Sequence, residues 1–480
     1  GMVADAFFVA FRLPNLFRRL FAEGAFSAAF VPIFSELLAS GDGSKTKEFV
    51  NQTFVILSLI LVLFLIVFEI IMPWVIVLMA PGFDQTPGKF ELAVELSRIT
   101  FPYLLFISLV SLQSGILHGL GHFAAVAATP ILLNLVLILA LLSEMGTQNE
   151  KGYALAFATS AAGLVQFIWL SYFCRKHGFS IDLKFPKLSA KIRSLGARTV
   201  PVIFGASLYQ LNLVIGTILA SLISEGAISY LYYADRVTQL PLGVIGVAIG
   251  TALLPTLSRQ ISLNSNEEAI KTQNRGLELS LFLTLPATAA FLAIPLPIVM
   301  VLFERGAFNH EASVATANAL SAFSIGLPAY VLIKVLAPGF FSRADTSTPV
   351  RIAAVSMVIN IFLNILFMQF LGHTGIALAS SISAWLNALS LGIILYKRGH
   401  FFIDKKLKNS ITKIFVSSVF MGICISFCAD FFDSLIVGTQ IEKLLILICL
   451  VFLGLTIFGI LVVVFKVTSC KDIAFLLRLR

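Results

Sequence analysis

The feature that most constrains this chain is a nearly unbroken succession of long apolar stretches. Runs of about 18 or more mainly apolar residues, the length that a helix needs to cross roughly 30 Å of hydrocarbon, recur about thirteen times. A segment in lipid must satisfy its own backbone hydrogen bonds, so each run predicts a helix. The chain has 480 residues, of which 58% are hydrophobic and 12% charged, and no soluble domain could bury so much apolar surface. The sequence therefore predicts an all-α polytopic membrane protein.

The predicted helices follow one another with short connections. After an opening segment over residues 5–32, they lie near residues 50–80, 93–117, 124–142, 153–173, 200–223, 227–254, 277–302, 316–341, 350–370, 375–396, 411–431 and 444–465. The chain opens on Gly1 without a signal-peptide pattern. We expect that a first helix is missing before Gly1, because one more span would give an even count.

The segments between the predicted helices alternate in charge. Those rich in Lys and Arg fall on one side, at residues 45–47, 175–198, 259–275, 343–351, 397–408 and in the tail that ends at Arg480. The opposite segments, such as PGFDQTPGKFEL and ERGAFNHEA, are poor in Lys and Arg relative to acids. By the positive-inside rule, the basic side and the C-terminus are cytoplasmic. This distribution accounts for the net charge of +9, so we expect no nucleic-acid partner.

The chain contains an internal repeat. FVPIFS at residues 30–35 is echoed by LLPTLS at residues 253–258, a spacing of about 223 residues that also relates later motifs. The repeated motifs cross the membrane in the same direction, so the two halves form a parallel repeat. This predicts two pseudo-symmetric six-helix lobes around a central cleft. Such a MATE-like arrangement is typical of alternating access. The predicted divisions are an N-terminal lobe at 1–174, which lacks its first helix, a basic cytoplasmic linker at 175–198, a C-terminal lobe at 199–397 and two additional helices at 398–480.

The opening segment carries charges that its apolar surroundings make costly. They are Asp5, Arg12, Arg18, Arg19 and Glu23, and Pro14 predicts a helix break among them. One charge at the centre of a membrane helix costs about 2.5–3.5 kcal/mol on insertion scales, so the arginines should face an aqueous cavity or a ligand. Arg19 and Glu23 can pair four residues apart, which leaves Arg18 to capture a phosphate with its planar fork. The alternative is that the arginines snorkel to the headgroups.

A second charged segment, SYLYYADRVTQLPLGVIGVAIG, lies at the matching place in the other half. Asp235 and Arg236 are neighbours on a helix and do not face each other, so each needs another partner. We expect Arg236 and Arg18 to converge on one anionic group, near Ser229; the alternative is a structural ion pair that holds the halves together. Lys334 is a third candidate cation, although it could equally snorkel.

The sequence contains no catalytic constellation. There is no P-loop, no Cys/His metal spacing and no Ser/His/Asp set on an exposed scaffold, so we expect no enzymatic activity and no bound cofactor. Transport would draw on an ion gradient or the membrane potential, with Na⁺ or H⁺ as the coupling cation. Asn360, Asn364 and Ser380 are weak candidate Na⁺ ligands, and hydrogen bonds between helices are the alternative role for these side chains.

Three stretches together resemble one known family. DAFFVAFRLPNLFRRLFAEGAFSAAFVPIF, YYADRVTQLPLGVIGVAIGTALLPTLS and KVLAPGFFSRADTSTPV are similar to the MurJ (MviN) lipid II flippases, within the multidrug/oligosaccharidyl-lipid/polysaccharide exporter superfamily. The resemblance implies fourteen helices, with the last two forming a groove for a lipid tail. It implies transfer of the undecaprenyl-diphosphate-linked peptidoglycan precursor across the bacterial inner membrane, amid membrane lipids and alongside peptidoglycan synthesis or division proteins. The positions that match the family are Asp5, Arg18, Glu23, Ser229 and Arg236, with Arg12 where relatives carry Arg or Lys.

Two departures and two rival functions accompany the resemblance. The family's first helix is absent, and Gly216, beside Asn212 and Thr217, stands where some relatives carry an acidic cation ligand. The second departure weakens the case for a cation at Asn360 and Asn364. One rival function is a drug or organic-cation antiporter of the same superfamily, which an Arg-rich cleft disfavours because it repels cations. The other rival is a non-transporting membrane scaffold for cell-wall enzymes.

Overall fold

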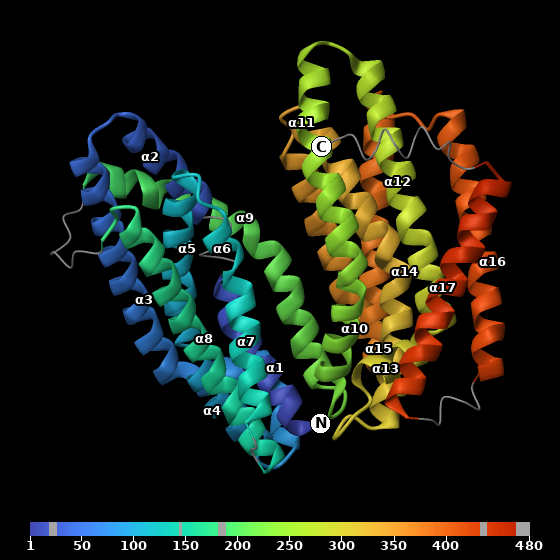
Figure 1. Cartoon of the computed structure of the whole chain (residues 1–480), viewed down its shortest axis with the longest axis horizontal. Coiled ribbons are helices and arrows are strands. Elements are labelled where there is room, and N and C mark those ends of the chain that lie inside the picture. The colour runs from blue at the N-terminus through green and yellow to red at the C-terminus, as the bar shows by residue number, and fades with distance from the viewer. Residues whose placement is uncertain (19–25, 144–145, 181–188, 433–438, 467–480) are drawn as a thin grey trace. The chain divides into compact units, whose positions relative to one another are not determined.

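The computed structural model describes residues 1–18, 26–143, 146–180, 189–432 and 439–466 (Figure 1). Within these ranges every regular element is helical, and nine helices are long and apolar enough to cross a membrane. The prediction of an all-α polytopic membrane protein is confirmed. Contacts divide the chain into unit 1, Gly1–Ile228, and unit 2, Ser229–Arg480. This division follows contacts and not the repeat, so the predicted lobe boundaries stay a prediction.

Unit 1 contains the first ten elements. They are α1 (Met2–Phe17), α2 (Ser27–Ala39), α3 (Gly43–Met79), η2 (Pro81–Gln85), α4 (Lys89–Thr100), α5 (Tyr103–Gly119), α6 (Ala124–Ala127), α7 (Thr129–Leu142), α8 (Gln148–Lys176) and α9 (Ala190–Ser221). Helix α8 packs along α5 and α7, and α1 packs along α4. The core is aromatic, with Phe30 stacked on Phe26, Phe34 and Phe49 at ring-centroid distances of 5.5–5.6 Å. Such stacks bury large apolar areas in a fixed geometry.

The predicted break at Pro14 is wrong, because α1 continues through this residue. A proline inside a helix deprives the carbonyl four residues earlier of its donor, which here is the carbonyl of Ala10. The Thr100 hydroxyl of α4 donates to the Ala10 oxygen at 3.0 Å. A neighbouring helix thus satisfies the orphaned acceptor, as is common where prolines occur in membrane helices.

Unit 2 contains the remaining elements. They are α10 (Ala227–Pro241), which begins at the unit boundary, the π-helical segment η3 (Leu242–Gly246), α11 (Val247–Ser262), α12 (Asn266–Ala293), α13 (Pro295–Phe303), α14 (His310–Phe341), α15 (Ser347–Lys397), α16 (Lys405–Phe432) and α17 (Gln440–Val464). Helix α14 packs along α15 and α12, α16 packs along α12, and α17 packs along α16 (Figure 1). The two C-terminal helices are therefore an integral layer of unit 2.

Helix α15 is a helical hairpin. A straight helix of 51 residues would be about 75 Å long, yet Asp345 before it and Arg398 after it form an ion pair at 2.6 Å. The chain reverses at Gly372, whose φ of 55° and ψ of −136° are open to glycine and strained for other residues. The Ser383 hydroxyl donates across the hairpin to the Ser356 carbonyl at 2.6 Å. The two spans predicted at residues 350–370 and 375–396 are confirmed as the arms of this hairpin.

Candidate functional site

A buried ion pair fixes the start of α1. Lys89 Nζ of α4 lies 2.8 Å from Asp5 Oδ2, and the two side chains are 4% and 1% exposed. The Gly226 amide, in the turn after α9, donates to the same oxygen at 2.7 Å. The Lys89 ammonium also lies 4.5 Å from the centroid of the Phe83 ring, a cation–π contact. Asp5 therefore joins three elements of unit 1 that are distant in sequence.

The next charged residue of α1 also reaches α9. Arg12 lies seven residues after Asp5, hence on the same helical face, and its Nη1 donates to the hydroxyl of Thr217. Thr217 is buried, and the Oδ1 atom of Asn212 nearby on α9 is buried without a hydrogen-bond partner in the described structure. A partly buried polar contact thus links α1 to α9 within a membrane-embedded unit.

Arg18 closes the described part of α1. Its backbone N–H bonds to the carbonyls of Pro14 and Asn15, and its side chain is half-buried. Phe17 packs edge-on against Phe64 and Phe68 of α3, at 5.0 and 5.1 Å between ring centroids. This packing fixes the end of α1 and so the direction in which Arg18 leaves it. Arg19 and Glu23, with their predicted pairing, lie outside the described residues.

In unit 2 the charged face of α10 presents an exposed guanidinium. Arg236 Cζ lies 4.7 Å from the centroid of Tyr232, one turn earlier, and the Arg236 side chain is exposed. Asp235 accepts a hydrogen bond from Gln239, so the two adjacent charges contact different neighbours. Ser229 is buried. A cation–π contact of this kind restrains the guanidinium while leaving N–H donors available.

A π-helical segment and a lysine lie directly after this face. Gly246, at the end of η3, contacts Lys334 of α14, and a β-carbon there would come within 2.8 Å of Lys334 Cδ. The lysine side chain therefore packs against bare backbone. π-Helical turns are rare and are frequently found at functional sites. Arg236 precedes this segment on α10, and Lys334 contacts its last residue.

Of the three candidate Na⁺ ligands, two contact each other and the third bonds to its own helix. Asn364 Nδ2 donates to Asn360 Oδ1 at 2.9 Å, and both residues are 1% exposed. The Ser380 hydroxyl donates to its own helix, at the Ile376 carbonyl. Among the described residues no group of three or more His, Cys, Asp or Glu could hold a metal ion. The cation site remains a prediction that rests on neutral oxygens.

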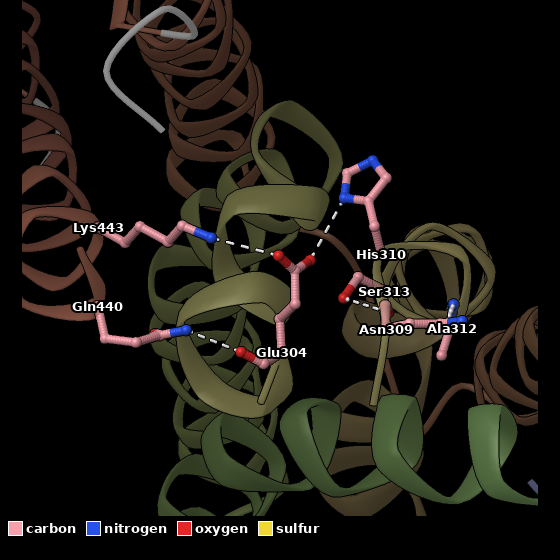
Figure 2. A network of polar contacts seen from close by, with 7 residues as sticks. All are labelled: Glu304, Asn309, His310, Ala312, Ser313, Gln440 and Lys443. Carbon is pink, nitrogen blue, oxygen red and sulfur yellow. Dashed lines mark hydrogen bonds and ion pairs between the residues drawn. The ribbon is translucent and has the colours of Figure 1, made fainter. Parts of the chain in front are cut away.

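A polar network joins α17 to the turn between α13 and α14 (Figure 2). Glu304 lies 3.2 Å from Lys443 Nζ and 3.3 Å from His310 Nδ1, and Gln440 Nε2 donates to the Glu304 carbonyl at 2.8 Å. Burial would raise the pKa of Glu304, but hydrogen bonds from Ser313, Lys443 and His310 and the Lys443 charge outweigh it and lower that pKa. The network is a charged clasp on the N-terminus of α17.

Comparison with known proteins then decides the family. A family model described as "Lipid II flippase MurJ" matches residues 1–448. The chain belongs to the MurJ family. A probable lipid II flippase MurJ of Rhizobium tropici is 43% identical over 429 residues, which cover 88% of this chain and 80% of that protein. The lipid II flippase MurJ of Burkholderia cenocepacia is 34% identical over 465 residues, which cover 95% of this chain and 90% of that protein.

Solved structures agree with the MurJ assignment. A lipid II flippase MurJ in an inward closed conformation superposes with a TM-score of 0.78 at 25% identity, over 97% of this chain and 93% of that one. An inward-facing MATE multidrug transporter gives a TM-score of 0.66 at 18% identity, over 82% and 93% of the two chains, which shows a shared fold alone. The MATE-like fold expected from the repeat is thereby confirmed.

For this MurJ family member, the structure adds two residues that the sequence reasoning did not select. Lys89 neutralises Asp5, and Thr217 receives Arg12. Lys89 lies in the segment PGFDQTPGKFEL, which the charge pattern treats as a loop, and Thr217 is an ordinary threonine in an apolar helix. Only the side-chain contacts that α1 makes with α4 and α9 identify them. Asp5 and Arg12 lie in unit 1, whereas Ser229 and Arg236 lie in unit 2.

Proposed function

We propose that this protein carries lipid II, the undecaprenyl-diphosphate-linked peptidoglycan precursor, from the cytoplasmic to the periplasmic leaflet of the bacterial inner membrane. The observation that carries the proposal is the MurJ family match over residues 1–448. Relatives of 43% and 34% identity are named for lipid II flipping. The translocation works by alternating access, a mechanism supported by the fold that the chain shares with transporters.

The chemistry of the intramembrane arginines fits the proposed cargo. A diphosphate offers several anionic oxygens, and guanidinium groups bind such oxygens in a bidentate manner that a lysine cannot match. Arg12 lies on α1, Arg18 directly follows it, and Arg236 lies on α10 in contact with the Tyr232 ring. In the proposed cycle these groups capture the diphosphate from opposite lobes. Neutralisation of their mutual repulsion then favours closure around the headgroup.

The remaining parts of the chain have assigned roles in the same proposal. Helices α16 and α17 keep the lipid tail in contact with the membrane while the headgroup crosses. The C-terminus is cytoplasmic, and release is coupled to entry of Na⁺ or H⁺, with Asn360, Asn364 and Ser380 as candidate ligands. The proposed work is transport and involves no bond-breaking step. Membrane lipids and peptidoglycan synthesis or division proteins are its further partners.

Genetic complementation tests the diphosphate clamp. Full-length protein with Arg236→Ala should fail to support growth of cells depleted of their own flippase, because a cation that the proposal assigns to the diphosphate is lost. Arg236→Lys should restore growth only in part, since the charge returns without the planar fork. The matched control is Arg351→Ala, which removes an exposed arginine at the start of α15 and should support normal growth. Normal growth with correctly inserted Arg236→Ala would overturn the clamp.

Direct binding separates the proposed function from its rivals. Native mass spectrometry of the purified protein should show lipid II retained more tightly than undecaprenyl phosphate, because the diphosphate adds oxygens for the arginines. An Arg236→Ala variant should lose this preference. Tight binding of organic cations without lipid II binding would favour the antiporter. Binding of none of these ligands would favour the scaffold.

A further inference from the structure

A second group of basic side chains lies at the end of unit 2 that the charge pattern assigns to the cytoplasm. It is formed by Arg343 in the turn between α14 and α15, and by Arg398 and His400 in the link between α15 and α16. The hairpin of α15 brings turn and link together, because the Asp345–Arg398 ion pair at 2.6 Å joins its two ends. We call these three side chains the basic cluster.

The described carboxylates near the basic cluster already have partners, and of these only Asp345 pairs with a member of the cluster, Arg398. Asp345 accepts from the Thr348 amide at 3.0 Å and from the Ser347 hydroxyl at 3.1 Å, so it caps α15 as well as pairing with Arg398. On the neighbouring α12, Arg275 pairs with both Glu278 and Asp404. The cluster therefore keeps an excess of positive charge.

Arg343 carries that excess. In the part of the chain that the structure describes, its guanidinium has no ion-pair partner and makes one hydrogen bond, from Nη1 to the Gly339 carbonyl at 2.8 Å. A guanidinium has five N–H donors, so most of its capacity remains for a ligand. Burial of this side chain lowers its pKa, which reflects the cost of a partly desolvated charge without a counter-ion.

The surface beside the basic cluster is aromatic and exposed. The Arg398 guanidinium lies 5.6 Å from the centroid of the buried Phe340, and on the exposed side of the link the rings of Tyr396 and Phe402 are 5.5 Å apart. Phe402 and Ile403 are 48% and 58% exposed. Aromatic side chains next to basic ones are typical of the headgroup level of a membrane, where apolar surface meets acyl chains.

We propose that Arg343, Arg398 and His400 bind the phosphate of an anionic phospholipid in the cytoplasmic leaflet. The cations meet the phosphate, and the exposed Tyr396, Phe402 and Ile403 meet the start of the acyl chains. A free phosphate would have no use for this apolar surface, which is why a lipid is the assigned occupant. The site is separate from the residues proposed to hold the transported diphosphate and does not depend on the proposed function.

The pKa of His400 can report whether the basic cluster holds a lipid phosphate. Burial and the charges of Arg343 and Arg398 lower the pKa of His400 below its ordinary value. A bound phosphate would offset the two guanidinium charges and favour the protonated imidazole. Occupancy of the site should therefore raise the pKa of His400.

Binding to purified full-length protein tests the site. Native mass spectrometry should show phosphatidylglycerol bound more tightly than zwitterionic phosphatidylethanolamine. Arg343→Gln should weaken phosphatidylglycerol binding roughly tenfold, the worth of one charge-assisted contact, whereas the control Arg351→Gln should leave it unchanged. Equal losses in the two variants would mean unspecific attraction and would overturn the site. Displacement by inorganic phosphate at equal concentration would show a free-anion site and would overturn the lipid assignment.

NMR of the histidines supplies a second readout, the pKa of His400. The conservative variant Arg343→Lys controls for misfolding. In detergent micelles with ¹³C-labelled histidine, adding phosphatidylglycerol should raise the pKa of His400 in the unaltered protein and in Arg343→Lys. It should leave this pKa unchanged in Arg343→Gln. If phosphatidylglycerol left the pKa of His400 unchanged in the unaltered protein, the proposal would be refuted. Undecaprenyl phosphate, added in parallel, should compete only weakly; strong competition would identify an entry site for the cargo instead.

Discussion

At the scale of single residues, the charges inside the apolar helices have two distinct environments. Asp5 and Lys89 neutralise each other in a dry site, whereas Arg236 is exposed and rests on Tyr232. A buried pair with good geometry repays its desolvation only when both partners are present. The first kind of charge therefore holds unit 1 together, and the second kind is open to a ligand.

Replacing Asp5 by Asn should destabilise unit 1. The Lys89 side chain, which is 4% exposed, would lose its counter-ion, and loss of one partner of a buried pair costs about 3–5 kcal/mol. We expect a large fall in the thermal unfolding temperature of the purified protein. The double change Asp5→Asn with Lys89→Met should recover part of the loss, because it removes the orphaned charge. No recovery would contradict a purely electrostatic role for the pair.

His400 should make stability depend on pH. Its pKa in the folded protein lies below the ordinary value of 6.5 because of burial and the Arg343 and Arg398 charges. Between the two pKa values the unfolded chain binds more protons than the folded one, so stability falls as the pH drops from about 7.5 through 6.5 toward the folded value. His400→Gln should reduce this slope in melting curves across pH. His118→Gln, a change at an exposed histidine of unit 1, is the control.

At the scale of elements, apolar length and charge predict the helices well, and local breaks less well. The thirteen predicted segments correspond to helices or helix pairs over the described ranges, including both arms of the α15 hairpin. Pro14 misleads because its effect is local, while the rescue of the Ala10 carbonyl comes from Thr100, far along the chain. The same limit hides Lys89 and Thr217. Partners supplied by another helix leave no periodic signal in the sequence.

The clasp on α17 should be sensitive to the charge of Glu304. Lys443 is 12% exposed and Glu304 is 16% exposed, and a hydrogen bond to a charged group contributes about 1.5–3 kcal/mol. Glu304→Gln should therefore speed amide hydrogen exchange in the first turns of α17. Glu311→Gln, an exposed change in the first turn of α14, should leave that exchange as it is. Similar exchange in both variants would show that α17 is held by apolar packing alone.

At the scale of the whole molecule, the internal repeat relates polar contacts as well as spans. In unit 2 the ends of α15 meet through Asp345 and Arg398. A shift of about 223 residues maps Asp345 onto His122 and His400 onto His177, and the rings of these two histidines lie 3.9 Å apart. The repeat thus conserves the meeting of a turn and a helix end while the chemistry differs. The spacing of the repeat predicts which positions correspond in the two halves. The contacts that those positions make are visible only in the folded structure.

Alternating access requires the two lobes to move relative to each other when the cargo binds. Spin labels at Ser44→Cys of α3 and Lys271→Cys of α12, both exposed, would report this motion in a chain whose native cysteines are replaced. Lipid II should shift the distance distribution between the labels if, as proposed, arginines of both lobes bind its diphosphate. A pair within unit 2, at Lys271 and Lys397, should not change.

The same measurement in Arg236→Ala distinguishes a clamp from passive docking. Removal of this cation should abolish the lipid-dependent shift even at lipid concentrations that restore occupancy, since a ligand moves an equilibrium only through its differential affinity for the two states. A shift that persists in Arg236→Ala would assign closure to other groups, with Arg12 and Arg18 as the next to replace. Identical distributions with and without lipid II in the unaltered protein would exclude closure on the cargo altogether.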